Sequence, residues 1–164
     1  MLGSINNLMT VDPGNITGIA VWKTGIIPYK TLDIRIKLAV GDPLDVDECV
    51  RQMAEKFTQL FQEDLNDCRP EIVYIEGVRV YNTLKSMTSA MRGNLMWLSY
   101  LVGAYTQIVH GFGAQAKIIE PSQWKGQMNK TAVKRRIERR IGMVYRNEHI
   151  TDAVGMGLSI AGIL

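Results

Sequence analysis

The 164-residue chain contains few of the residues that stabilise small secreted domains or build zinc sites. It has two cysteines, Cys49 and Cys68, and two histidines, and neither pair shows the close spacing of zinc ligands. We therefore expect both cysteines to be reduced, small hydrophobic residues in a reducing compartment. A chain of this length buries a sufficient core without disulfides or a structural metal.

Long apolar runs are also missing. No stretch approaches the roughly 20 consecutive apolar residues that a membrane-spanning helix needs, and the first residues lack the basic start and apolar block of a signal peptide. We expect a cytoplasmic protein with no membrane partner. The chain has no repeats, low-complexity tract or linker, so residues 1–164 are predicted to form a single domain.

Positive charge is concentrated in one part of the chain, although the net formal charge is only +3. Residues 33–76 contain eleven acidic and five basic side chains, whereas residues 117–146 contain nine basic and two acidic ones. Such a basic cluster is typical of proteins that bind a polyanion. A solvated helix face would carry the same residues, so the charge alone leaves both interpretations open.

Apolar periodicity predicts strands first, and then strands that alternate with helices. The expected strands, of which the first three form an antiparallel meander, cover residues 7–12, 18–24, 29–37, 72–75 and 116–119. The expected helices cover residues 45–62, 84–110, 130–140 and 149–164. This order predicts an α/β fold in which helices cover a mixed sheet.

The predicted helix at residues 84–110 is apolar on more than one face. One side would pack on the sheet, and another would be free to pack against a second copy of the protein. A single broad core face explains the same pattern, so the residues leave both interpretations open.

Two of the predicted strands end at a carboxylate. Asp12 closes the first strand before Pro13 and Gly14, and Glu76 closes the fourth before Gly77. If these strands are parallel neighbours, both side chains lie at the sheet edge where ligands bind in open α/β sheets. Asp-Pro-Gly is also an ordinary turn sequence, and Glu76 alone would mark only the end of a strand.

The last predicted helix begins with two further candidate ligands. His149 and Asp152 are three residues apart, which places them on one helix face. Clustered carboxylates repel one another unless a cation balances them, and oxygen-rich sets suit Mg²⁺ or Mn²⁺. Because two such ions together catalyse phosphodiester hydrolysis, we predict that Asp12 bridges two ions, with Glu76 on one and His149 and Asp152 on the other. Singly, Asp152 is explained by the helix dipole, and a lone histidine is more often structural.

Together these motifs resemble a known family. Residues 11–14 and 17–21, then Ile75-Glu76, then residues 149–158 are similar to the RuvC-type Holliday-junction resolvases of the ribonuclease H-like superfamily. The resemblance covers nearly the whole chain in order. It implies a five-stranded mixed sheet flanked by helices and a homodimer that nicks opposing strands of a four-way DNA junction.

The resemblance also assigns roles to individual residues. It implies that the metal ligands are Asp12, Glu76, His149 and Asp152, with an aspartate at the histidine position in some family members. A catalytic lysine of the family matches Lys125, and a second lysine most nearly matches Lys130, although the connection between them is shorter here. The family dimerises through the region of the helix at residues 84–110, which favours the interface interpretation of that helix.

Two segments supply candidate DNA contacts. Phosphates attract basic side chains without regard to sequence, and the residues that surround the apolar seam of the basic helix are Lys134, Arg135, Arg136, Arg139 and Arg140. The segment after Glu76 offers Arg79 and Lys85 for phosphates and Tyr81 for stacking on an unpaired base. Tyr81 also fits a rim position that exposes only its hydroxyl group.

Three alternatives belong to other functional classes. An actin-like or sugar-kinase-like phosphate-binding domain shares the Asp-x-Gly and Thr-Gly hairpin, but that architecture needs two such domains. A non-catalytic DNA-structure binder would not require the complete acidic set. A related nuclease acting on RNA or on branched DNA in general is compatible with the same residues, because fold and metal chemistry do not determine the substrate.

Overall fold

Five strands form one mixed sheet in the order β3-β2-β1-β4-β5. The computed structural model describes residues 7–36, 45–64, 68–78 and 94–164. The strands are β1 (Leu8–Asp12), β2 (Ile16–Trp22), β3 (Lys30–Arg35), β4 (Ile72–Glu76) and β5 (Gln115–Ile119). The pairs β1–β2 and β2–β3 are antiparallel, whereas β1–β4 and β4–β5 are parallel. This confirms the predicted antiparallel meander and the predicted mixed sheet.

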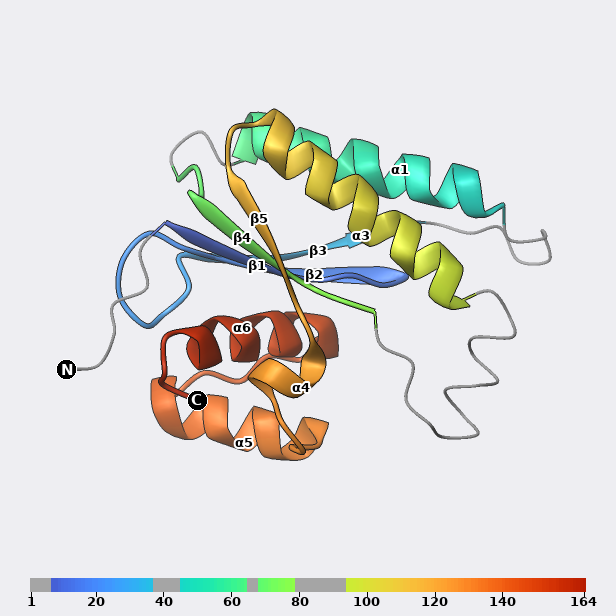
Figure 1. The fold of residues 1–164 in the computed structure, drawn as a ribbon. Coiled ribbons are helices and arrows are strands. Elements are labelled where there is room, and N and C mark those ends of the chain that lie inside the picture. Colours follow the sequence, from blue (N-terminus) through green and yellow to red (C-terminus); the bar gives the residue numbers. More distant parts are fainter. Residues whose placement is uncertain (1–6, 37–44, 65–67, 79–93) are drawn as a thin grey trace.

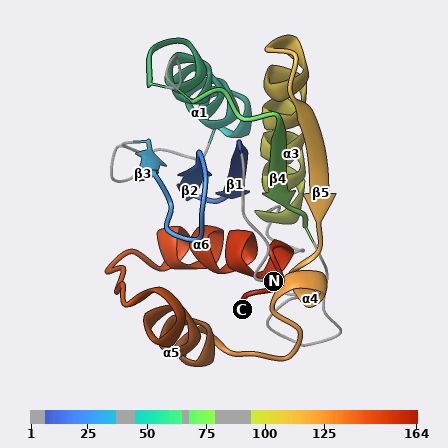
Figure 2. The ribbon, with the colours of Figure 1, turned by 90° about the vertical axis from the view of Figure 1, so that its left-hand side faces the viewer.

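Helices cover both faces of the sheet. They are α1 (Val46–Gln59) with a π-helical continuation η1 (Leu60–Asp64), α3 (Asn94–Gly111), α4 (Pro121–Trp124), α5 (Lys130–Ile141) and α6 (Glu148–Ile160). Figure 1 shows α1 and α3 on one face and α6 on the other, with α5 outside α6. The turned view in Figure 2 shows the strands side by side between these layers.

Each face of the sheet buries its own apolar cluster. Alternation along the strands sends Val11, Val73 and Ile75 to the cluster under α1 and α3, and sends Leu8 and Trp22 to the cluster under α6. Strand β4 is covered on both sides, because its Ile72 and Tyr74 pack against the cluster under α6. The two free cysteines, Cys49 and Cys68, are buried as expected.

The helix ends follow from local hydrogen bonding. Asp45 caps α1, and its carboxylate accepts hydrogen bonds from the amides of Asp47 and Glu48. The side chain of Asn129 accepts from the amide of Ala132 at the start of α5.

The prediction of a helix reaching residue 164 was wrong. Helix α6 ends at Ile160, because Gly162 adopts a positive φ of 69° and the chain turns back. The amide of Ile163 then donates to the carbonyl of Leu158, which returns the Ile163 side chain to the core.

Two other elements differ in extent from their predictions. The segment around Trp124, for which no helix was predicted, forms the short helix α4, whose capping box joins Glu120 and Gln123. The described part of the long helix starts at Asn94, and residues 84–93 of the prediction lie outside the described residues. None of the helices in the described ranges is long and apolar enough to cross a membrane.

Candidate active site

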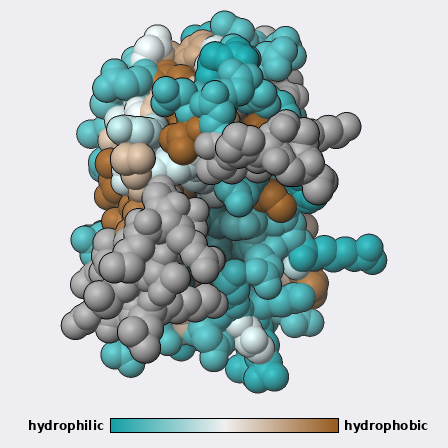
Figure 3. Space-filling model, turned by 90° about the vertical axis from the view of Figure 1, so that its right-hand side faces the viewer, coloured by the Kyte–Doolittle hydropathy of each residue, from teal (hydrophilic) through white to brown (hydrophobic). Residues whose placement is uncertain are grey.

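Asp12 and Glu76 occupy the last positions of two neighbouring parallel strands. The register pairs Val11 of β1 with Ile75 of β4, so each carboxylate follows one residue beyond this pair. This confirms the strand arrangement that the sequence predicts for these two residues. Figure 3 shows the side of the molecule toward which β4 runs in Figure 1, and hydrophilic residues line a hollow there.

Helix α6 begins against the same end of the sheet. The Asn147 side chain caps it by accepting a hydrogen bond from the amide of His149, and it donates to Asp33 of β3 at 2.6 Å. Gly18 of β2 permits the close approach, because a Cβ there would lie 2.1 Å from the carbonyl carbon of His149. Farther along, the hydroxyl group of Thr10 donates to the carbonyl of Ala153. These contacts hold His149 and Asp152 over the strand ends.

His149 is paired directly with Asp12. Its Nδ1 lies 2.7 Å from Oδ2 of Asp12. Burial raises the pKa of Asp12, while the hydrogen bond and charge of His149 partly oppose that rise. The same hydrogen bond raises the pKa of His149. A short hydrogen bond therefore joins the two side chains at the edge of the sheet.

Lys125 joins the other two carboxylates. Its Nζ lies 3.5 Å from Oε1 of Glu76 and 3.5 Å from Oδ2 of Asp152. Because both oxygens lie near one nitrogen, they are separated by no more than twice that distance. Burial alone lowers the pKa of Lys125, but Glu76, Asp152 and Asp12 together raise it above its ordinary value. Lys125 is thus a permanent cation inside the cluster.

Trp124 contacts Glu76, and its sequence context had not led us to include it in the candidate site. Its buried indole donates from Nε1 to Oε2 of Glu76 at 3.1 Å, and its carbonyl accepts from the hydroxyl of Ser159. The ring packs so closely on α6 that a Cβ at Gly155 would lie 2.9 Å from it. A signal was present in the sequence, because Trp124 precedes the candidate lysine and a buried indole needs an acceptor.

The Glu76 carboxyl group has a pKa well above its ordinary value. Burial raises the pKa of Glu76 to about 7, and repulsion from Asp12 adds to the rise. Lys125 and the hydrogen bond from Trp124 act in the opposite direction. A carboxylate in such a position gains stability in its ionised form when a further cation binds beside it.

The donor set fits divalent magnesium or manganese. Three carboxylates and one imidazole provide mostly oxygen ligands. Burial, with a smaller contribution from neighbouring carboxylates, raises the pKa of Asp12 and of Glu76, and a bound cation would favour their ionised forms. Among the described residues, no three histidine, cysteine or acidic side chains stand together as a finished metal site. The carboxylates are instead engaged by His149 and Lys125.

The basic residues of α5 fall into separate groups. Val133 and Ile137 form the buried apolar seam of this helix. Its basic residues are exposed, namely Lys130, Lys134, Arg135, Arg136, Arg139 and Arg140. Lys130 pairs with Glu148 at 2.6 Å and, with Lys134, lines a pocket that includes Asp152. Arg136, Arg139 and Arg140 line another hollow beside Leu164.

Three candidate DNA contacts cannot be located, and the candidate dimer helix is described only from Asn94 onward. Arg79, Tyr81 and Lys85 lie outside the described residues. On α3, Met96 and Tyr100 have about half of their surface exposed, 54% and 53%, which leaves apolar side chains available on the helix expected to form a dimer.

Comparisons with known proteins show the fold. No protein-family model and no curated protein matches the chain. A solved structure of Thermus thermophilus RuvC in complex with a Holliday junction substrate is 19% identical, with a TM-score of 0.66 over 93% of this chain and 90% of that one. Another Thermus thermophilus RuvC structure, also 19% identical, gives a TM-score of 0.64 over 93% and 91%. The chain therefore has the ribonuclease H-like fold of RuvC.

Proposed function

We propose that this protein is a structure-selective endonuclease that resolves four-way DNA junctions by metal-dependent phosphodiester hydrolysis. The observation that carries the proposal is the convergence of Asp12, Glu76, His149 and Asp152 at one sheet edge of a RuvC-type fold. Fold likeness alone does not determine a reaction, so the side chains at this edge are the stronger support. We further propose that residues 1–164 act as a single nuclease domain.

The four ligand candidates would hold two Mg²⁺ ions, or Mn²⁺. When bound, such ions activate a water molecule and stabilise the leaving oxygen of a phosphodiester. Asp12 is the central ligand in this proposal, because it contacts His149 directly and its strand is the neighbour of the strand that ends at Glu76. Asn147 and Gly18 serve the site indirectly, since they seat the start of α6 and with it His149.

Lys125 would act as the charged partner of the substrate. The surrounding carboxylates raise the pKa of Lys125, so it stays protonated at neutral pH. Its ammonium group lies between Glu76 and Asp152, where it limits the repulsion between these carboxylates and an incoming phosphodiester. We propose this role for Lys125 in place of direct proton transfer.

DNA would be held by the basic face of α5 and by the segment after β4. Lys130, Lys134, Arg135, Arg136 and Arg139 are the proposed phosphate contacts, and Arg79, Tyr81 and Lys85 remain candidates. We propose that a homodimer forms through residues 84–110. The exposed Met96 and Tyr100 of α3 support this surface, and two copies would supply two sites for paired nicks.

The test is cleavage of four substrates side by side: a four-way junction, a flap, a linear duplex and an RNA–DNA hybrid. We expect symmetric nicks in the junction with Mg²⁺ or Mn²⁺. Asp12→Asn should retain junction binding and lose cleavage, because it removes a ligand charge without adding bulk. Glu55→Gln is the matched control, since Glu55 is an exposed carboxylate on α1, on the opposite face of the sheet.

Each contrary result points to a different conclusion. Equal cleavage by wild type and Asp12→Asn would refute the site. Faster cleavage of the hybrid would favour an RNA nuclease, and junction binding without cleavage in either metal would favour a non-catalytic binder. ATP binding would favour the actin-like alternative.

A further inference from the structure

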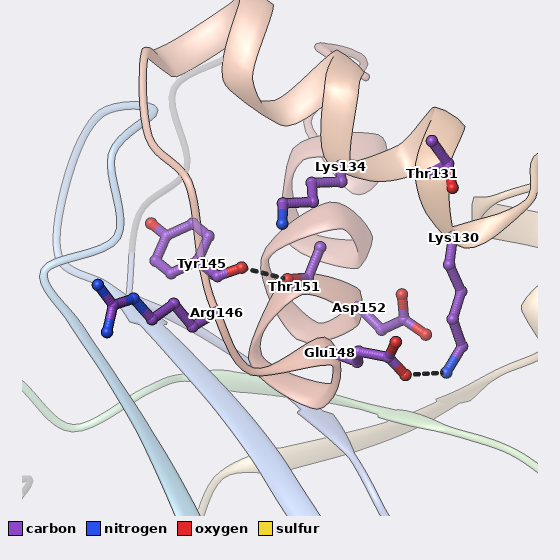
Figure 4. A pocket seen from close by; sticks show the side chains of 8 residues that line it. All are labelled: Lys130, Thr131, Lys134, Tyr145, Arg146, Glu148, Thr151 and Asp152. Carbon is purple, nitrogen blue, oxygen red and sulfur yellow. Dashed lines mark hydrogen bonds and ion pairs between the residues drawn. The ribbon is translucent and has the colours of Figure 1, made fainter.

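A pocket of about 360 Å³ opens beside the carboxylate cluster, between the first turns of α5 and α6. Lys130, Thr131 and Lys134 line it from α5, and Asp152 lines it from α6 (Figure 4). Asp152 also contacts Lys125 within the cluster. Asp152 therefore belongs to both the pocket and the candidate active site. A nucleic acid strand bound at the active site would continue into the pocket.

The positive charges around this pocket are not equivalent. Glu148 engages Lys130 at 2.6 Å and so offsets its charge. Within the described parts of the chain, no carboxylate forms an ion pair with Lys134 or with Arg146, which lines the pocket from the segment before α6. Figure 4 shows the Lys134 nitrogen pointing into the space between the helices. The pocket therefore has an ion-paired lysine at one end and, at the other, two cations without an ion pair among the described residues; Glu148, whose charge also acts on Lys134, is held by Lys130.

An ammonium group without an ion-pair partner favours the binding of an anion in its pocket, and lysine binds phosphate as a point charge. Lys130 and Lys134 lie one turn apart on the same face of α5, so their side chains form a line along the pocket. A nucleic acid backbone presents negative charges in such a line. Phosphate contacts of this kind determine the register of the bound strand.

We propose that this pocket binds the phosphodiester next to the scissile one in the cleaved strand, with Lys134 as its main contact and Arg146 as the second. This inference rests on the proposed nuclease function and adds a site that positions the DNA strand along the active site. The neighbouring phosphate, anchored here, sets which phosphate faces Asp12, Glu76 and Asp152. The pocket thus contributes to the choice of the cut position.

The test combines Lys134→Gln with junctions that carry a single uncharged methylphosphonate at successive positions around the cut. Dissociation constants are measured by fluorescence anisotropy in EDTA at fixed salt, so that cleavage does not enter the result. Arg51→Gln is the matched control, because Arg51 is an exposed cation on α1, and α1 covers the opposite face of the sheet.

We expect Lys134→Gln to weaken junction binding about threefold to tenfold and to lower the salt slope by about one. At one position next to the cut, methylphosphonate should weaken wild type and Arg51→Gln by a similar factor but leave Lys134→Gln unaffected. Arg146→Gln should show the same coupling to a smaller extent.

Independent, multiplicative effects of Lys134→Gln and every methylphosphonate would overturn the pocket assignment. That result leaves the nuclease proposal intact if wild type still prefers the junction. A wild type that binds junction and duplex equally, yet shows the coupling at one phosphate in both, would refute junction selectivity and support the pocket.

Discussion

Trp124→Phe tests the contact between the α4 indole and Glu76. The substitution keeps an aromatic ring in the buried space but removes the N–H that donates to Oε2 of Glu76 at 3.1 Å. Glu76 then retains Lys125 on its other oxygen and loses the group that fixes its orientation. We expect weaker divalent-metal binding, because a freer and less well solvated carboxylate is a poorer ligand.

The expected magnitude follows from the kind of hydrogen bond that is lost. A hydrogen bond to a charged group contributes about 1.5–3 kcal/mol, which corresponds to roughly a tenfold to hundredfold change in affinity. Replacing the partner that orients a metal ligand typically lowers metal affinity by about the same factor. We therefore expect the Mn²⁺ dissociation constant of Trp124→Phe to rise about tenfold to a hundredfold.

Two measurements check this expectation. Isothermal titration of metal-free protein with Mn²⁺ gives the affinity directly. Tryptophan fluorescence gives a second readout, because Trp124 touches Glu76 and its emission should change when a metal binds there. The metal-induced change should disappear in Trp124→Phe, while junction binding in EDTA stays close to wild type.

Trp22→Phe is the matched control. Trp22 belongs to the same apolar cluster and packs against α6 at Gly157, but its indole donates to the Ile26 carbonyl instead of Glu76. It therefore loses a similar ring volume without touching the site. Equal Mn²⁺ affinities for Trp124→Phe and Trp22→Phe would refute the proposed role of Trp124.

Two further predictions concern stability. The pKa of Glu76 is raised from 4.5 to about 7, so metal-free folded protein keeps a proton that the unfolded chain releases, and the free energy of unfolding should fall by up to about 3 kcal/mol as pH rises through this window. Denaturant titrations in EDTA at pH 5 and 7.5 should show a smaller fall for Glu76→Gln, and equal falls would contradict the prediction. Gly18→Ala should destabilise the fold by about 1–3 kcal/mol or more and displace His149, since its Cβ would collide with the α6 backbone. Gly103→Ala, with no atom within 4 Å of the added Cβ on α3, should stabilise by about 0.5–1 kcal/mol in the same assay, and the reverse ranking would count against the close approach at Gly18.

Local patterns predicted those parts of the site that depend on one segment at a time. Turn residues after apolar runs indicated the strand ends at Asp12 and Glu76, and the three-residue spacing indicated that His149 and Asp152 share a helix face. The apolar seam of the basic helix could be predicted in the same way, because helix periodicity alone determines which residues share a face; Val133 and Ile137 are buried on it.

The prediction of the last helix failed at its C-terminal end, where apolar periodicity continues but the helix does not. Apolar residues continue to Leu164, but the positive φ of Gly162 ends the helix and returns Ile163 to the core. A glycine allows this turn without requiring it, so the sequence alone did not reveal the end of α6.

The amino-acid sequence by itself determined the order of the strands and longer helices and the residue types of the candidate site, because these depend on periodicity and turn chemistry within short segments. Only the tertiary structure decided how the side chains engage one another: Trp124 and Lys125 on Glu76, and Asn147 on Asp33. These partners are 48, 49 and 114 residues apart. Their contacts depend on how α4 and α6 pack against the sheet, and that packing is set by the apolar cluster as a whole rather than by any one segment.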